Sequence, residues 1–298
     1  MQLQDYVNDV QELIHDSSGS AWPLNRVISR INEARLDAAR DMHCVRQVVT
    51  GVQLLQGQEV YNLNGAVVGA NVAAGGTGYG AGPTAPVTFS APPPGGTQAL
   101  AVGNITSGAL SSITMTQWGS GYVSQPTITI GGIGTGAAAT AVTLFNTLSV
   151  VSISIIWTLL NRYNLGYMDF TMFQAYFRMF GSIFQNTPAK FSHHQQGQQI
   201  YIQPPPNQVY LSDWDVISLP QNLINLSDVD TQLIDPWARA VQFRASELLF
   251  MKMLNGGHPL SEKYGAKYES HVPRIITTSG GIRIPNPYDR TFQRRVSR

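Results

Sequence analysis

The feature that most constrains the fold is a long stretch without charged residues or histidine. Between Glu59 and Arg162 there is no Asp, Glu, Lys, Arg or His, and the stretch holds 17 of the 28 glycines. Inside it, GTGYGAGPT from Gly76 matches GSGYVSQPT from Gly119, an offset of 43 residues. Each motif precedes short runs of alternating Val, Ile, Thr and Phe, a pattern typical of strands with one buried face. The sequence therefore predicts an inserted all-β domain of two repeats over residues 65–149.

Charge is scarce in the rest of the chain too. Charged residues make up 12% of the 298 residues and the formal net charge is +1, against roughly 25% charged residues in an average globular protein. A protein that coats nucleic acid needs a concentrated basic surface, and a net charge of +1 argues against that role. The low share of charged residues favours instead an assembly subunit whose neutral surfaces are covered by partners. Cys44 is the single cysteine. We expect no membrane segment and no signal peptide, because no apolar run reaches roughly 18 residues and the N-terminus is acidic.

Apolar periodicity predicts about four helices. Two form a helical hairpin over residues 3–14 and 22–41, a third covers 168–180, and a fourth runs from Asp235 to Leu254. The fourth has Asp235 as its expected N-cap and carries two apolar faces. We expect its second face to contact another subunit through Phe243, Phe250 and Leu254.

Strands are predicted over 45–63, 151–157, 199–203 and 209–219. The expected fold is therefore α+β: a bundle of about four helices with a small antiparallel β part, an inserted all-β domain and an extended C-terminal arm. The expected boundaries are 1–64 and 150–260 for the body, 65–149 for the insertion and 261–298 for the arm.

Candidate chemistry is sparse. Asp213 and Asp215 share a face of their predicted strand, as a carboxylate pair would for acid–base or Mg²⁺ chemistry, but a solvated strand edge is the commoner use of such a pair. His193 and His194 are adjacent, so a strand would point them to opposite faces. We predict no catalytic, cofactor or metal site, and hence a protein that is not an enzyme.

The order of elements resembles a known family. A helical hairpin opened by Trp22-Pro23, a strand with GQEVYNL, the run PNQVYLSDWDVISLP and the DPW helix are similar, in that order, to head-to-tail adaptor proteins of short-tailed bacteriophages, also called tail tubular or connector proteins. The resemblance covers residues 1–64 and 148–298, and the insertion resembles GSGY-containing β-repeats of phage structural proteins.

The resemblance implies a virion protein of the tail or neck, assembled in the host cytoplasm. It implies a homo-oligomeric ring, dodecameric in the family, that joins the portal protein to a tail nozzle or tail fibre protein and lets genomic DNA pass without sequence recognition. The alternative is a receptor- or glycan-binding tail component, with Tyr79, Trp118 and Tyr122 as surface aromatics of the insertion. A wall-degrading hydrolase is a third alternative.

The C-terminus combines positive charge with apolar anchors. From Ser270 onward the sequence holds six arginines and a single acidic residue, Asp289. Pro285 and Pro287 favour extended backbone. We expect this arm to contact the portal or a neighbouring subunit, with channel DNA as the second choice and a solvated tail as the third. The predicted contact residues are Ile282, Arg283, Ile284, Pro285, Pro287, Tyr288, Arg290, Phe292, Arg294 and Arg295.

Overall fold

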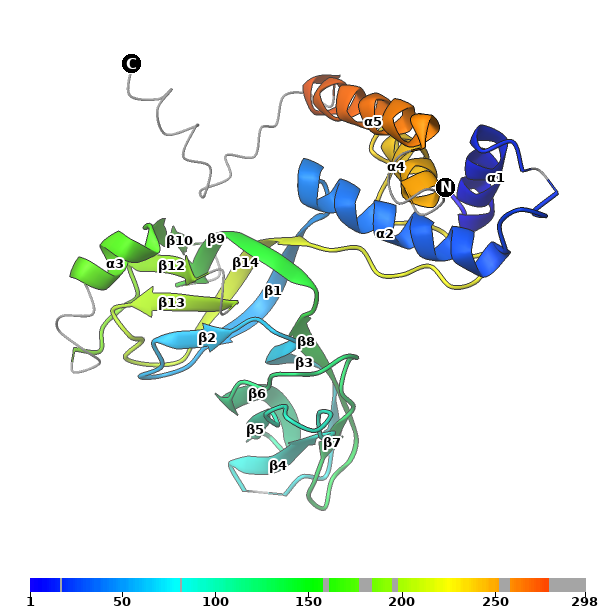
Figure 1. Ribbon diagram of the computed structural model, residues 1–298. Helices are drawn as coiled ribbons and strands as arrows, with labels where there is room; N and C mark the ends of the chain where they lie inside the picture. The colour runs from blue at the N-terminus through cyan, green and yellow to red at the C-terminus, as the bar shows by residue number, and fades with distance from the viewer. Residues whose placement is uncertain are drawn as a thin grey trace. The chain divides into compact units, whose positions relative to one another are not determined.

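The structure is a computed structural model, and it describes residues 1–16, 18–80, 82–157, 161–176, 184–194, 198–251 and 258–278. The chain divides into a helical unit, residues 1–46 with the chain from Ile217 onward, and a β unit, residues 47–216 (Figure 1). Strand accounts for 40% of the fold and helix for 26%. The described residues form five helices and four sheets, so the prediction of a four-helix bundle with a small β part is wrong.

In the part of the helical unit that the structure describes, four helices pack around one apolar cluster. They are α1 (Leu3–Leu13), α2 (Leu24–Met42), α4 (Ala238–Met251) and α5 (Pro259–Thr278). The hairpin of α1 and α2 confirms the sequence prediction, because its residues at spacings of three and four, such as Val27 and Ile31, are fully buried. α4 begins at Ala238 rather than at the expected N-cap Asp235.

The helix α5 replaces the first half of the expected arm. Tyr264 and Tyr268 are buried, Ile275 is buried further along the helix, and α5 packs along α4. The two tyrosines are four residues apart, the start of an amphipathic stripe that Gly265 and Pro273 obscure in the sequence. Residues 261–278 therefore belong to the helical unit, and the arm proposed from the sequence can begin only after Thr278.

Outside the insertion, the described residues of the β unit form two four-stranded sheets and one short helix. The first sheet has the order β1-β14-β9-β10, and the second β11-β12-β13-β2. Their bounds are β1 (Arg46–Leu54), β2 (Val60–Asn62), β9 (Thr147–Ile156), β10 (Arg162–Asn164), β11 (Gly166–Tyr167), β12 (Lys190–His194), β13 (Gln199–Gln203) and β14 (Tyr210–Ser218), with α3 at Phe170–Tyr176. The helix α3 packs against β12. All of the strand regions expected in the body are present, but they form two full sheets.

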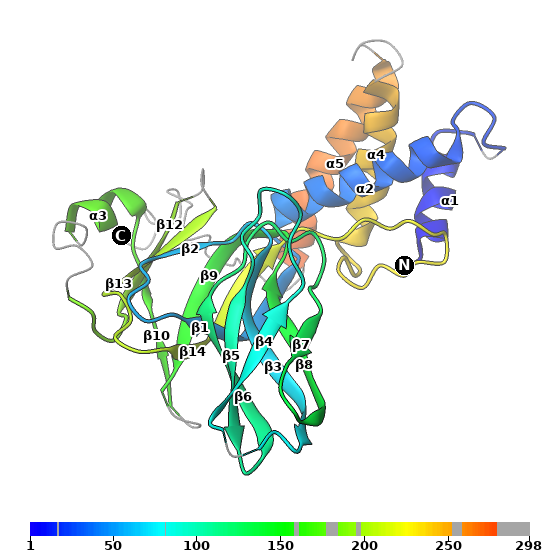
Figure 2. The ribbon, with the colours of Figure 1, turned by 90° about the horizontal axis from the view of Figure 1, so that it is seen from below.

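The insertion folds as two interlocked repeats (Figure 2). Its strands are β3 (Ala66–Thr77), β4 (Thr84–Phe89), β5 (Leu100–Thr106), β6 (Ala109–Gln117), β7 (Ile128–Ile130) and β8 (Thr135–Leu144). β4 and β7 pair antiparallel with Val87 opposite Ile130, residues that are themselves 43 apart. Each repeat's last strand pairs with the other repeat's first strand, because β3 pairs with β8 and β5 with β6. The insertion therefore has an internal two-fold pseudo-symmetry that relates its two repeats.

The tyrosine of each motif is fixed by a glycine of the other repeat. The Tyr79 N–H donates to the Gly108 carbonyl at 3.0 Å, and the Tyr122 N–H donates to the Gly65 carbonyl at 3.1 Å. Gly65 and Gly108 are also 43 apart, and both have positive φ. A Cβ at Gly65 would lie 2.2 Å from the Tyr122 carbonyl oxygen, so glycine is needed for this close approach.

The insertion shares its core with the body strands. The Trp118 ring contacts Tyr61 and Trp214 at centroid distances of 4.6 and 5.7 Å, and its Nε1 donates to the Gln53 carbonyl at 2.7 Å. One apolar cluster therefore runs from the repeats into both sheets. The compact unit consequently extends over 47–216 rather than over the expected 65–149.

Candidate interaction surface

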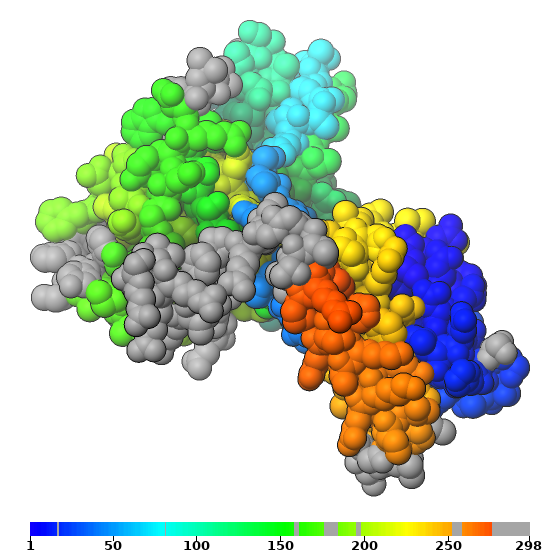
Figure 3. Space-filling view, turned by 90° about the horizontal axis from the view of Figure 1, so that it is seen from above, coloured from blue at the N-terminus to red at the C-terminus, as the bar shows by residue number. Residues whose placement is uncertain are grey.

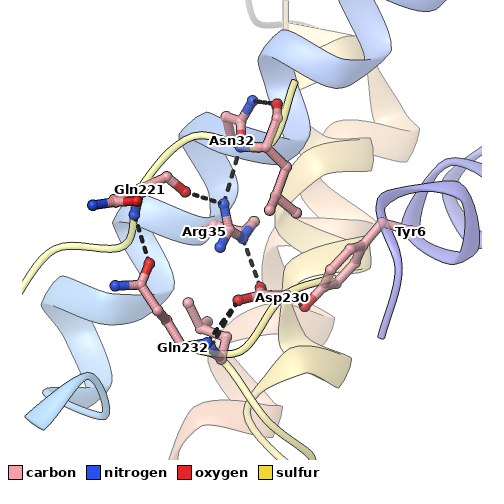
Figure 4. A network of polar contacts seen from close by, with 8 residues as sticks. Tyr6, Asn32, Arg35, Gln221, Asp230 and Gln232 are labelled. Carbon is pink, nitrogen blue, oxygen red and sulfur yellow. Dashed lines mark hydrogen bonds and ion pairs between the residues drawn. The ribbon is translucent and has the colours of Figure 1, made fainter. Parts of the chain in front are cut away.

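A buried polar network fixes the connection between β14 and α4, here called the 219–237 segment (Figure 4). The Arg35 Nε donates to Asp230 Oδ2 at 2.7 Å, and Arg35 Nη1 donates to the Gln221 carbonyl at 2.7 Å. The Tyr6 hydroxyl donates to the same Asp230 oxygen at 3.1 Å. The segment is thereby attached to α2 through Arg35 and to α1 through Tyr6.

Asp230 is held in its ionised form despite its burial. Burial opposes ionisation, but the hydrogen bond from Arg35 and the backbone N–H groups of Leu233 and Gln232 bring the pKa of Asp230 below its ordinary value. Burial, followed by the charge of Asp230, raises the pKa of Tyr6, which keeps its hydroxyl protonated as a donor. Arg35 is 1% exposed and lies four residues after Ile31 on the apolar face of α2. An arginine at that position was the sequence signal for a buried acidic partner, and the pattern of apolar residues alone did not reveal it.

The segment also makes backbone contacts with the start of α1. The Leu3 N–H donates to the Asp228 carbonyl and the Gln4 N–H to the Leu226 carbonyl, at 2.9 and 3.0 Å. In the space-filling view the yellow residues of the segment lie beside the dark blue residues of α1 (Figure 3). The backbone of the segment is therefore held on α1 as well as on α2.

Three large apolar side chains of this fixed segment point into solvent. Ile224, Val229 and Ile234 are 75%, 54% and 57% exposed. Asp228 lies between them, and the N–H groups of Ile224 and Asn225 lower the pKa of its carboxyl. Because hydrogen bonds to α1 and α2 already hold the backbone of the segment, binding through these side chains would cost little additional backbone order.

A groove runs beside this surface along the first half of α2. It is lined by apolar side chains, Ile28, Leu36, Leu223 and Ile224, and by Asn25, Ser29, Asn32, Glu33 and Asn222. Asn32 fixes one wall of the groove, because its side chain accepts from the Leu223 N–H and donates to the Leu223 carbonyl, both at 2.9 Å. A second hollow lined by Asp228 and Arg35 shares Asn222 and Leu223 with the groove.

The second apolar face of α4 has a partner within the chain. Phe250 is 6% exposed and stacks on His258 and Tyr264, at centroid distances of 4.8 and 6.0 Å. Phe243 is half-buried, with His271 of α5 stacked on its ring. The helix α5 therefore covers the face that we expected to contact another subunit. Leu254 lies outside the described residues.

The three aromatics expected on the surface of the insertion are buried. Tyr79, Trp118 and Tyr122 are 9%, 6% and 6% exposed. The Tyr122 hydroxyl accepts from the Ala99 N–H at 3.2 Å and donates to the Ser90 carbonyl at 3.0 Å. Gly134 lies against the Tyr79 ring. Because their rings pack inside the unit, they are not available to stack on sugars.

The two aspartates considered as a carboxylate pair differ in their exposure. Asp213 is 4% exposed and pairs with Arg162 Nη1 at 2.6 Å, while Asp215 is partly exposed. Burial lowers the pKa of His193 to about 4, so its imidazole is neutral at pH 7. The predicted contact residues of the arm, Ile282 to Arg295, lie outside the described residues.

No family model matches the chain, and no curated protein matches it.

Within the described residues, no group of three His, Cys, Asp or Glu side chains is arranged to hold a metal ion. No helix in the same part of the chain has the length and hydropathy of a membrane span.

Proposed function

We propose that this chain is a virion structural protein, a head-to-tail adaptor that assembles into a ring, joins the portal to the tail and continues the DNA channel. The observation that carries the proposal is the exposure of three large apolar side chains, Ile224, Val229 and Ile234, in the 219–237 segment, whose backbone is attached to α2 through Arg35 and Asp230. Such a surface suits repeated contacts between protein subunits.

The resemblance in element order supports the same proposal. The Trp22-Pro23 hairpin, the end of the VISLP run and the DPW helix all belong to the helical unit, and the GQEVYNL strand belongs to the β unit. The low charge content adds to this, because identical subunits packed around an axis bring like charges together and a neutral surface avoids that repulsion. In the proposed ring each subunit would offer one surface to the portal and another to the tail protein below.

The receptor-binding alternative has lost the side chains that suggested it, because Tyr79, Trp118 and Tyr122 are buried. We therefore propose a single function.

The test is the assembly state of the purified chain, alone and with the portal protein encoded in the same genome. We expect closed rings in negative-stain electron microscopy and a stable ring–portal complex in size-exclusion chromatography. A stable trimer with no affinity for the portal would overturn the adaptor proposal and favour a fibre component.

A further inference from the structure

The groove beside α2 is an open depression with a partly apolar lining. Its volume is about 520 Å³, within the range of pockets that hold small ligands or a few side chains. Ile28, Leu36, Leu223 and Ile224 supply its apolar lining. The wall formed by Leu223 is attached to α2 through the paired hydrogen bonds of Asn32.

The groove adjoins one acidic side chain, Asp228. Glu33 lines the groove itself, but its charge is balanced by an ion pair with Arg30. Asp228 lines the adjoining hollow, its ionised form is stabilised by backbone N–H groups, and no ion pair to it is present in the described part of the chain. An extended peptide with apolar anchors and positive charge would complement this surface.

The last 20 residues of the chain have that composition. Residues 279–298 contain five arginines and one aspartate, a net charge of +4; because the whole chain is +1, residues 1–278 carry −3. Ile282 and Ile284 alternate with Arg283, so an extended backbone would direct the isoleucines to one side and the arginine to the other. Tyr288 and Phe292 come next in the sequence as larger anchors.

We propose that the groove between α2 and residues 222–224 binds the segment 279–298 of a second copy of this chain. The proposal rests on the proposed function only in requiring that copies of the chain assemble with one another. Each copy would then offer one groove and one segment, a head-to-tail contact that repeats around a ring.

The helix α5 contacts α2 at the end opposite to the groove. The Tyr268 hydroxyl donates to Asp41 at 2.7 Å, near the C-terminal end of α2, and α5 ends at Thr278. The groove lies along the other half of α2, from Asn25 to Leu36. Twenty extended residues span at most about 70 Å, a reach that covers the segment's own groove as well as a neighbour's. A second copy is chosen because the proposed ring needs a contact between copies, and the mixing experiment below separates the two cases.

The test uses two full-length variants that each disable one side of the contact. Ile224→Lys places a positive charge in the groove, and its 75% exposure means that the fold should tolerate it. The second variant carries Arg290→Glu, Arg294→Glu and Arg295→Glu in the segment. Ile133→Lys is the matched control, because Ile133 is 83% exposed and lies in the insertion. Circular dichroism at 222 nm checks that each variant is folded.

Sedimentation velocity should show that the native chain and Ile133→Lys self-associate equally, whereas each disabled variant associates more weakly by on the order of tenfold or more. Mixing the two disabled variants should give a 1:1 heterodimer, because one supplies an intact segment and the other an intact groove. A native chain that stays monomeric, or a mixture without heterodimer, overturns the proposal. If the native chain self-associates but Ile224→Lys behaves like Ile133→Lys, the groove assignment fails while the assembly proposal stands.

Discussion

Replacing Asp230 by alanine should be among the most damaging single changes in the helical unit. Asp230 is 3% exposed and accepts hydrogen bonds from Arg35, the Tyr6 hydroxyl and two backbone N–H groups. Its removal leaves the guanidinium of Arg35 buried without a counter-charge. Breaking a buried pair in this way costs about 3–5 kcal/mol, so we expect the free energy of unfolding of the helical unit to fall by about 4 kcal/mol.

The control is Asp235→Ala. Asp235 also pairs with an arginine, Arg239, at 2.8 Å, but the two side chains are 60% and 70% exposed. Exposed pairs of this kind contribute about 0–1 kcal/mol. The same chemical change should therefore have a small effect at position 235 and a large one at position 230.

Urea unfolding followed by circular dichroism at 222 nm measures the difference in the free energy of unfolding. The helical signal reports on the helical unit because, among the helices of the described residues, only α3 lies outside it. A double-mutant cycle with Arg35→Met adds a second criterion. Once Arg35 is absent, Asp230→Ala no longer strands a buried charge, so the double variant should lose clearly less than the sum of the two single variants. Equal losses at 230 and 235, or additive losses in the cycle, would refute the assignment of Arg35 and Asp230 as a coupled buried pair.

Three further predictions concern single side chains. The lowered pKa of Asp230 stabilises the fold above the unfolded value of about 3.9, and this contribution is lost as the pH falls through the lower folded value; the urea midpoint of the native chain should therefore drop more between pH 6 and pH 3 than that of Asp230→Asn, and parallel pH curves would contradict this. Phe250→Ala should cost about 3–5 kcal/mol in thermal or urea unfolding of the isolated chain, since α5 covers Phe250 within one subunit; a folded chain that fails only to assemble would instead place Phe250 at an interface. Tyr122→Phe should destabilise the β unit by about 1 kcal/mol because the Ala99 N–H loses its acceptor, whereas Tyr79→Phe, made at the equivalent position of the other repeat, should change the urea midpoint of tryptophan fluorescence by less.

Local patterns were enough for several elements. The helical hairpin was predictable because Val27 and Ile31 repeat with the period of a helix, and a helix needs only contacts along its own chain. The repeat of 43 residues was equally visible, since its motifs are written in the order of the sequence. Five of the eight body strands were predicted individually, whereas β10, β11 and β12 were not. The two four-stranded sheets were underestimated as a small β part because strand pairing joins distant residues.

Exposure was harder to foresee than secondary structure. Tyr79 and Tyr122 sit in glycine-rich turns, where an aromatic ring is expected to face solvent, yet each turn closes against the other repeat. The candidate surface was missed for the same reason, because Ile224, Val229 and Ile234 have no periodicity that marks them as exposed.

By itself, the sequence determined the helical hairpin, the neutral two-repeat insertion and the contrast between a net negative body and a positive C-terminal end, because periodicity, repetition and charge are properties of neighbouring residues. Only the tertiary structure decided which faces are covered. Arg35 and Asp230 are 195 residues apart, and their burial as a pair depends on the 219–237 segment crossing α2. The second face of α4 is covered because α5 packs on it, and the insertion joins the body because Trp118 reaches Trp214. Such contacts depend on distances between parts of the chain that no local pattern encodes.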